Sequence, residues 1–130
     1  MEEQIFQTKP RVDDVYVAKQ IAKEIAIEKA KHNLLHVNKN CEISIDEQVV
    51  IVDTTISDVI INIPNDDTII DHGKFYIFKD EMETAEINNV IINPNGLFVD
   101  KTNCFVINKN GGSIKIIYSK LKKKWYSLNV

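Results

Sequence analysis

The chain lacks any apolar run that approaches a membrane span in length, and its 130 residues include only four glycines and two cysteines. A transmembrane helix needs about 20 consecutive apolar residues, so we expect no membrane-spanning segment. The first residues, Met1-Glu2-Glu3-Gln4, are acidic, whereas a secretory signal begins with basic and then apolar residues. These absences predict a protein that folds in the cytosol.

The two cysteines offer little support for metal or disulfide chemistry. Cys41 and Cys104 each lie inside a predicted strand, form no CxxC pair and have no histidine at ligand spacing. Free cysteine often acts as a small core residue, so we expect two buried or half-buried thiols. A disulfide between them would require that their strands be neighbours.

The motifs of nucleophilic and nucleotide-dependent enzymes are also missing. The sequence contains no GxSxG elbow and no GKS or GKT loop, and Gly111-Gly112 precedes a predicted strand instead of a helix. No pair of carboxylates is singled out for glycoside hydrolysis. We therefore expect no catalytic residues, no cofactor and no enzyme activity.

Two groups of residues invite interpretation as metal sites. Glu28, His32 and His36 recur every four residues and would share one face of a continuous helix. They do not form the zincin motif HExxH, because no glutamate stands between the two histidines. In a symmetric trimer, His32 could instead meet its copies at the axis and form a pH-sensitive contact. The acidic loop at residues 66–71 lacks the spacing of a calcium loop, so we expect no bound metal.

The charge balance argues against nucleic acid and anionic membrane as partners, since the net charge is −3 and the pI is near 5.6. The stretch Lys120 to Lys124 beside Trp125 and Tyr126 resembles the basic and aromatic pattern of single-strand binders. A charged hairpin tip, followed by aromatic residues turned into the core, accounts for the same pattern. We favour the hairpin, because the rest of the chain adds no second basic stripe.

The N-terminal third predicts two elements. Residues 1–11 show no periodicity and predict an extended arm, and residues 12–38 predict a helical stalk or anchor. An aspartate at position 13 or 14 would cap this helix, which is predicted through about Leu35 and followed by a connector at residues 37–40.

The apolar stripe of this helix is short and consists largely of small residues. Val15, Ala18, Ala22 and Ile25 fit a coiled-coil seam, and Ile21 joins an overlapping row spaced by four. An isolated helix of this length is marginal in water. We therefore expect it to pack on the head, on a partner subunit or on a capsid surface.

From residue 41 the apolar period changes from about 3.6 to 2, which predicts β-strands. Eight segments qualify: 41–45, 49–52, 59–63, 74–78, 90–92, 104–107, 113–118 and 125–128. Asn-, Gly- and Pro-containing turns separate several of them. We predict a mainly β fold: a small antiparallel β-sandwich or jelly-roll-like head at residues 39–130, with about eight short strands and one N-terminal α-helix.

The landmarks of residues 49–130 resemble a trimeric β module of phage and large-virus head-fibre, tail-fibre and capsid-decoration proteins. The matching residues are Asp53-Thr54-Thr55, Ile63-Pro64, Ile77-Phe78-Lys79-Asp80, Asn88-Asn89-Val90-Ile91-Ile92, Pro94 with Gly96, Gly112-Ser113-Ile114, Tyr118-Ser119 and Trp125-Tyr126. The Lys-rich last turn departs from the small Asp-Gly or Asn-Gly tip of that family. The resemblance implies an antiparallel β domain that trimerises and projects from, or decorates, a virion.

The resulting hypothesis is a homotrimeric virion protein, a head fibre or capsid-decorating protein that folds in the host cytoplasm before assembly. Its partners would be its own copies, the major capsid protein or another virion protein, and a host surface glycan or receptor. The hypothetical trimer or capsid interface comprises Phe6, Val15, Ala18, Ile21, Ala22, Ile25 and Trp125. The alternative is a carbohydrate-type ligand-binding β-sandwich that uses loops at residues 66–72 and 93–103.

Overall fold

The computed structural model describes residues 17–21 and 34–129. The chain divides into two compact units, Met1–Lys31 and His32–Val130. In the described part of the first unit, residues 17–21 are helical. The predicted arm at residues 1–11 and most of the predicted helical segment lie outside the described residues.

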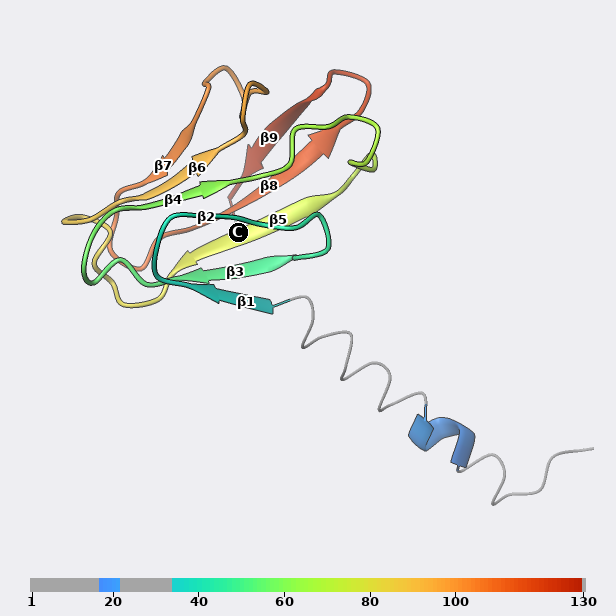
Figure 1. Ribbon diagram of the computed structural model, residues 1–130, viewed down its shortest axis with the longest axis horizontal. Helices are drawn as coiled ribbons and strands as arrows, with labels where there is room; N and C mark the ends of the chain where they lie inside the picture. The colour runs from blue at the N-terminus through green and yellow to red at the C-terminus, as the bar shows by residue number, and fades with distance from the viewer. Residues whose placement is uncertain (1–16, 22–33, 130) are drawn as a thin grey trace, which may run out of the picture. The chain divides into compact units, whose positions relative to one another are not determined.

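The second unit, which we call the head, contains nine described strands in two sheets (Figure 1). The strands are β1 (Leu34–Val37), β2 (Cys41–Glu42), β3 (Val49–Val52), β4 (Val59–Asn62), β5 (Phe75–Asp80), β6 (Val90–Asn93), β7 (Phe105–Ile107), β8 (Ser113–Ser119) and β9 (Lys124–Leu128). The five-stranded sheet has the order β1-β3-β5-β8-β9, and the four-stranded sheet has the order β2-β4-β6-β7.

Successive strands from β1 to β6 alternate between the two sheets. Odd-numbered strands pair in parallel in the five-stranded sheet, and even-numbered strands pair in parallel in the four-stranded sheet. Parallel neighbours need a long crossover connection, and here the strand in the opposite sheet forms part of it. We call residues 34–93 the parallel coil, because each turn of the chain adds one strand to each sheet.

The last three strands join the sheets through antiparallel pairs. β7 pairs with β6 in the four-stranded sheet, and β8 pairs with β5 and β9 in the five-stranded sheet, all in antiparallel fashion. β7 and β8 therefore run against the parallel coil, whereas β9 runs in the same direction as the coil, because it is antiparallel to β8.

The mainly β class with two sheets is confirmed, and the eight predicted strand segments correspond to β2–β9. The antiparallel prediction was wrong for four of the seven pairings of named strands in the described residues, and these parallel pairs also rule out a jelly roll of antiparallel strands. The reason is that side chains alternate between the faces of a strand with the same period of two in either direction.

The predicted end of the helical segment was also wrong. Leu34–Val37 forms β1 where the sequence predicted helix through about Leu35 and then a connector. This strand pairs in parallel with β3, and Leu35 and Val37 pack against the core. Pairing and burial override helix propensity here, as tertiary contacts often do.

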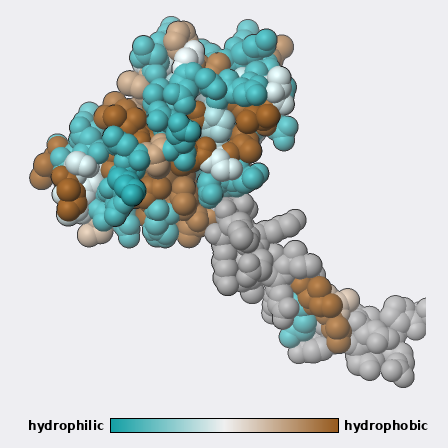
Figure 2. Space-filling model, viewed as in Figure 1, coloured by the Kyte–Doolittle hydropathy of each residue, from teal (hydrophilic) through white to brown (hydrophobic). Residues whose placement is uncertain are grey.

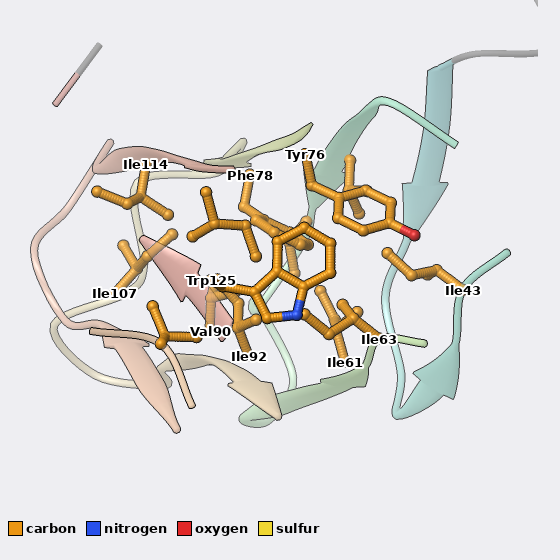
Figure 3. Close-up of a cluster of buried hydrophobic side chains, with 14 of the residues drawn as sticks. Ile43, Ile61, Ile63, Tyr76, Phe78, Val90, Ile92, Ile107, Ile114 and Trp125 are labelled. Carbon is orange, nitrogen blue, oxygen red and sulfur yellow. The ribbon is translucent and has the colours of Figure 1, made fainter. Parts of the chain in front are cut away.

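Large aromatic side chains fill the core between the sheets (Figure 3). Trp125 on β9 is fully buried, with its ring centroid 5.5 Å from that of Tyr76 and 5.0 Å from that of Tyr118. Tilted aromatic pairs at such distances add to the stabilisation from apolar burial. The antiparallel strands β8 and β9 thus place two large rings against residues of the parallel coil.

One tetrapeptide, Val-Ile-Ile-Asn, forms both β4 and β6, and the two copies stack in register. Their asparagines meet at the end of the strands, where the Asn93 Nδ2 atom donates to the Asn62 Oδ1 atom at 2.8 Å. The loops before these strands are also joined, because the Thr54 and Thr84 hydroxyl oxygens lie 2.7 Å apart and the Asn89 amide donates to Asp58. Side-chain bonds therefore hold successive turns of the coil together at both ends of these strands.

Candidate assembly surface

The outer face of the five-stranded sheet, which points away from the core, is largely apolar. Val50, Val52, Tyr76 and Phe78 point into the core, so the residues between them point outward. One row of outward residues crosses all five strands in register: Leu34, Val49, Ile77, Lys115 and Leu128. We call this set the outer row. Four of its five side chains are apolar.

A second outward row extends the apolar surface. It comprises Phe75, Ile117 and Tyr126, which pair directly across β5, β8 and β9. The Nζ atom of Lys115 lies 4.3 Å from the Phe75 ring centroid, and that of Lys124 lies 5.0 Å from the Tyr126 ring centroid. Such contacts place the lysine stems over apolar surface.

The strands of this sheet carry apolar residues on both faces. β3 is Val-Val-Ile-Val, and β5 begins Phe-Tyr-Ile-Phe. Near-continuous apolar runs are typical of strands that are covered on both faces, whereas a sheet with one solvated face usually alternates apolar and polar residues. The outer face of the five-stranded sheet therefore has the composition of a surface that packs against another layer.

The first turn of the parallel coil offers an incompletely covered end of the core. Leu35, Val37, Cys41 and Ile45 pack against the core but are only partly buried. Among the described residues, β1 and β2 are edge strands with no strand on their outer sides. Unpaired edges and uncapped repeat ends are sites where a further chain segment or another subunit can add.

The residues of the predicted interface have different outcomes. Phe6, Val15, Ala22 and Ile25 lie outside the described residues, whereas Ala18 and Ile21 lie in the helix at residues 17–21. Ile21 is 52% exposed and Val17, four residues earlier, is 53% exposed. Trp125 was wrong as an interface residue, because its side chain is fully buried inside the head.

The metal interpretation of the histidine face fails at His36. Glu28 and His32 lie outside the described residues, but His36 belongs to β1 and so cannot continue a helical face. Its Nδ1 atom lies 3.9 Å from a Glu81 carboxylate oxygen. In the part of the chain that the structure describes, no cluster of His, Cys, Asp or Glu has the arrangement of a metal site.

The acidic loop at residues 66–71 has structural partners. Asp66 accepts hydrogen bonds from the hydroxyl and the amide of Thr68, and these bonds lower the pKa of its carboxyl group. Asp67 accepts a 2.7 Å hydrogen bond from the Tyr118 hydroxyl. Burial, with this bond, raises the pKa of Tyr118 to about 12. These carboxylates therefore fasten their loop to itself and to β8.

A hollow of about 370 Å³ lies beside this loop, at the end of the four-stranded sheet. It is lined by Glu42, Ile43, Ser44, Ile45, Asn62, Ile63, Pro64, Asn65, Ile69 and Asn95. Ile69 and Asn95 come from the two loops of the alternative, ligand-binding hypothesis. The lining combines side-chain amides with apolar residues, but it includes no aromatic ring on which a sugar could stack.

Sequence reasoning missed the outer row because it treated each strand separately. The available signal was the near-continuous apolar character of segments 49–52 and 75–78, which indicates burial on both faces. The cysteine prediction was confirmed, since both thiols are free and half-buried. Cys41 lies on one edge strand of the four-stranded sheet, and Cys104 immediately precedes the other.

Comparison with protein-family models and with curated proteins finds no match to this chain. None of the described helical residues form a segment with the length and hydropathy of a membrane span.

Proposed function

We propose that this chain is a virion structural protein: a homotrimeric head fibre or capsid-decorating protein without catalytic activity. Residues 1–38 would attach it to the major capsid protein or another virion protein, and the head would be displayed toward a host glycan or receptor. The virion would be its location after folding in the host cytoplasm. The resemblance of residues 49–130 to trimeric fibre modules motivates the proposal.

The outer row is the observation that carries the assembly part of the proposal. Leu34 and Leu128, at its two ends, are 46% and 45% exposed, and Val49 and Ile77 between them are only half-buried. A head of this size buries a modest fraction of its apolar surface by itself. Burial of the outer row between copies would stabilise the head, and the half-covered first turn of the coil adjoins the same sheet edge at β1.

The described helical residues support a second contact. Val17 and Ile21 are four residues apart, so they share one side of the helix, and both are more than half exposed. The sequence continues this apolar row to Ile25. In the proposed trimer this row would pack in a bundle of three copies or on the capsid surface.

A charge in the outer row tests the assembly. We expect the full-length protein to have the mass of a trimer at micromolar concentration by light scattering after size exclusion. Ile77→Asp should yield folded monomers. The new carboxylate would lie on the outer face, where water reaches it in the monomer, and it would lose that water only when the interface forms. Ile91→Asp is the matched control, since Ile91 is also half-buried on an outer face, that of the four-stranded sheet.

The outcomes separate cleanly. A wild-type protein that is monomeric at micromolar concentration would contradict the trimer. A trimer that persists in Ile77→Asp but dissociates in Ile91→Asp would place the interface on the other sheet. Virion association is tested by density in intact particles, where copies should occur in threes on the shell.

The ligand-binding alternative has one favourable observation, the hollow shared by its two loops. In that case the wild-type head should bind a defined glycan on an array. Asn95→Gln, which places a longer side chain in the wall of the hollow, should weaken this binding while the trimer mass stays unchanged. Binding that is unaffected by this substitution would remove the hollow as the site.

A further inference from the structure

The hairpin tip between β8 and β9, residues Lys120–Lys124, carries four lysines, of which Lys120 interacts electrostatically with Asp66. Lys120 donates to the carbonyl of Ile70, and Lys124 lies over the Tyr126 ring, but Lys122 and Lys123 point into solvent as exposed residues. No lysine of the tip is within ion-pair distance of a carboxylate in the described part of the chain. Leu121, in the same tip, is 84% exposed.

The backbone of the tip is strained at Lys123. Lys123 has a φ of 55°, in the left-handed region that suits glycine or asparagine. A strained non-glycine residue at the end of a hairpin is an observation from which a function can be inferred. The inference is that the lysine side chain matters more than the relaxed turn.

The opposite end of the head has the complementary character. We call residues 53–58 and 81–89 the acidic loops, which connect β3 to β4 and β5 to β6. All five of their charged residues are acidic: Asp53, Asp58, Glu81, Glu83 and Glu86. Lys79 donates to the Gly111 carbonyl beside the Glu83 side chain, and Glu86 accepts a long hydrogen bond, 3.5 Å, from the Asn110 amide.

Exposed apolar side chains accompany these carboxylates. Ile56 and Ile87 are 88% and 82% exposed, and each stands three residues before its Val-Ile-Ile-Asn strand. Figure 2 shows hydrophobic surface at the left end of the head, where the acidic loops lie in Figure 1. Glu83 also has a left-handed φ, 56°. Each end of the head therefore combines exposed isoleucine or leucine with a charged residue in a strained turn.

These two surfaces of one head cannot touch each other. The tip lies beside the start of β5, because the Tyr118 amide donates to the Lys74 carbonyl. The acidic loops begin where β5 ends, at Asp80. Six residues of strand separate them by about 17 Å, so a contact between tip and loops requires a second copy.

A closed ring of three identical subunits uses a heterologous contact, in which one patch of each subunit meets a different patch of the next. We propose that Lys122 and Lys123 of one copy contact Glu83 and Glu86 of the next, with Leu121 lying against Ile56 and Ile87. This inference rests on the proposed homotrimer and names the pair of surfaces that would close it. Opposite charge fixes the partner and the orientation of such a contact more than its affinity.

Zero-length cross-linking of the full-length protein tests the contact directly. A carbodiimide joins a lysine to a carboxylate only when the two touch, so the roughly 17 Å inside one head rules out an intramolecular product. In a mixed sample of ¹⁴N- and ¹⁵N-labelled chains, we expect linked peptides that join residue 122 or 123 to residue 83 or 86 and carry both labels. Trimers whose tip lysines react with an amine reagent but give no such peptides would overturn the inference.

Charge reversal provides the second arm. The double variant Lys122→Glu/Lys123→Glu should raise the concentration for half-dissociation of the trimer about tenfold, because each of the three contacts in the ring would lose two exposed pairs. Adding Glu83→Lys/Glu86→Lys to the same chain should restore it, whereas Lys101→Glu, another exposed lysine, should change it little. Wild-type trimers with no effect in any variant would overturn only the tip contact, while a monomeric wild type would overturn the proposed function as well.

Discussion

The parallel coil and the antiparallel strands β7–β9 are specified by different kinds of sequence information. In the coil, identical segments stack in register, and Asn, Thr and Asp side chains join one turn to the next. In the antiparallel part, a hairpin brings β8 and β9 together and delivers Tyr118 and Trp125 to the core. The repeated segments therefore form the stacked strands of the coil, and the non-repeating strands complete both sheets and supply large side chains to the core.

Removing the largest core side chain should have the largest effect on both parts of the head. Trp125→Ala should lower the free energy of unfolding by about 3–5 kcal/mol, because it deletes a buried ring and leaves a cavity beside Tyr76 and Tyr118. Urea denaturation should show one transition, since the ring contacts both parts. A variant whose coil unfolds separately would mean that the two parts are independent.

The control for this change lies on the same strand. Tyr126 points to the outer face, so Tyr126→Ala should cost the head much less than Trp125→Ala. It would be expected to weaken the proposed trimer, which makes measurements at several protein concentrations necessary. If Tyr126→Ala and Trp125→Ala lower the free energy of unfolding equally at all protein concentrations, both rings contribute only to folding.

Strand positions were predictable from the sequence, but strand direction was not. Period-two alternation and turn residues located β2–β9, because both features are local. The direction of pairing depends on which distant strand lies alongside, and alternation carries no such information. One non-local signal was present: Ile-Xaa-Xaa-Val-Ile-Ile-Asn occurs at residues 56–62 and again 31 residues later. Internal repeats of this kind indicate stacked, parallel turns.

The candidate surfaces were less predictable than the fold. Trp125 was included in the hypothetical interface, although the hairpin interpretation turned the same aromatic residues into the core, and its position on β9 does turn it inward. The outer row depends on the register between five strands, which no single segment encodes. The lysine tip was correctly placed between two strands, but only the backbone shows that Lys123 occupies a left-handed position.

The asparagine pair that joins two turns of the coil should make an intermediate contribution to stability. Asn93→Ala removes the bond to Asn62 and the bond that the Asn95 amide donates to Asn93, so it should destabilise the head by about 1–2 kcal/mol. A double-mutant cycle with Asn62→Ala should give a coupling energy of at least about 0.5 kcal/mol. Strictly additive effects would show that the pair does not hold the turns together, and Asn108→Ala, in an exposed turn, serves as the surface control.

The smallest expected effect has the opposite sign and lies in the antiparallel part. Lys123→Gly should stabilise the head by about 0.5–1 kcal/mol, because glycine adopts a φ of 55° without the cost that a side chain brings. Lys122→Gly is the matched control. Residue 122 has no positive φ, so glycine relieves no strain there. Because glycine gives the unfolded chain more freedom, the free energy of unfolding should stay unchanged or fall slightly.

Measurements on Lys123→Gly separate the requirements of folding from those of assembly. If the tip meets the acidic loops of a neighbouring copy, this variant should unfold at higher urea concentration yet dissociate into monomers more readily than the wild type. The two changes have opposite signs because one concerns the backbone of the turn and the other the lost charge. A variant that gains stability and also keeps its trimer at full strength would show that Lys123 is dispensable at the tip, which would leave Lys122 alone to meet the carboxylates.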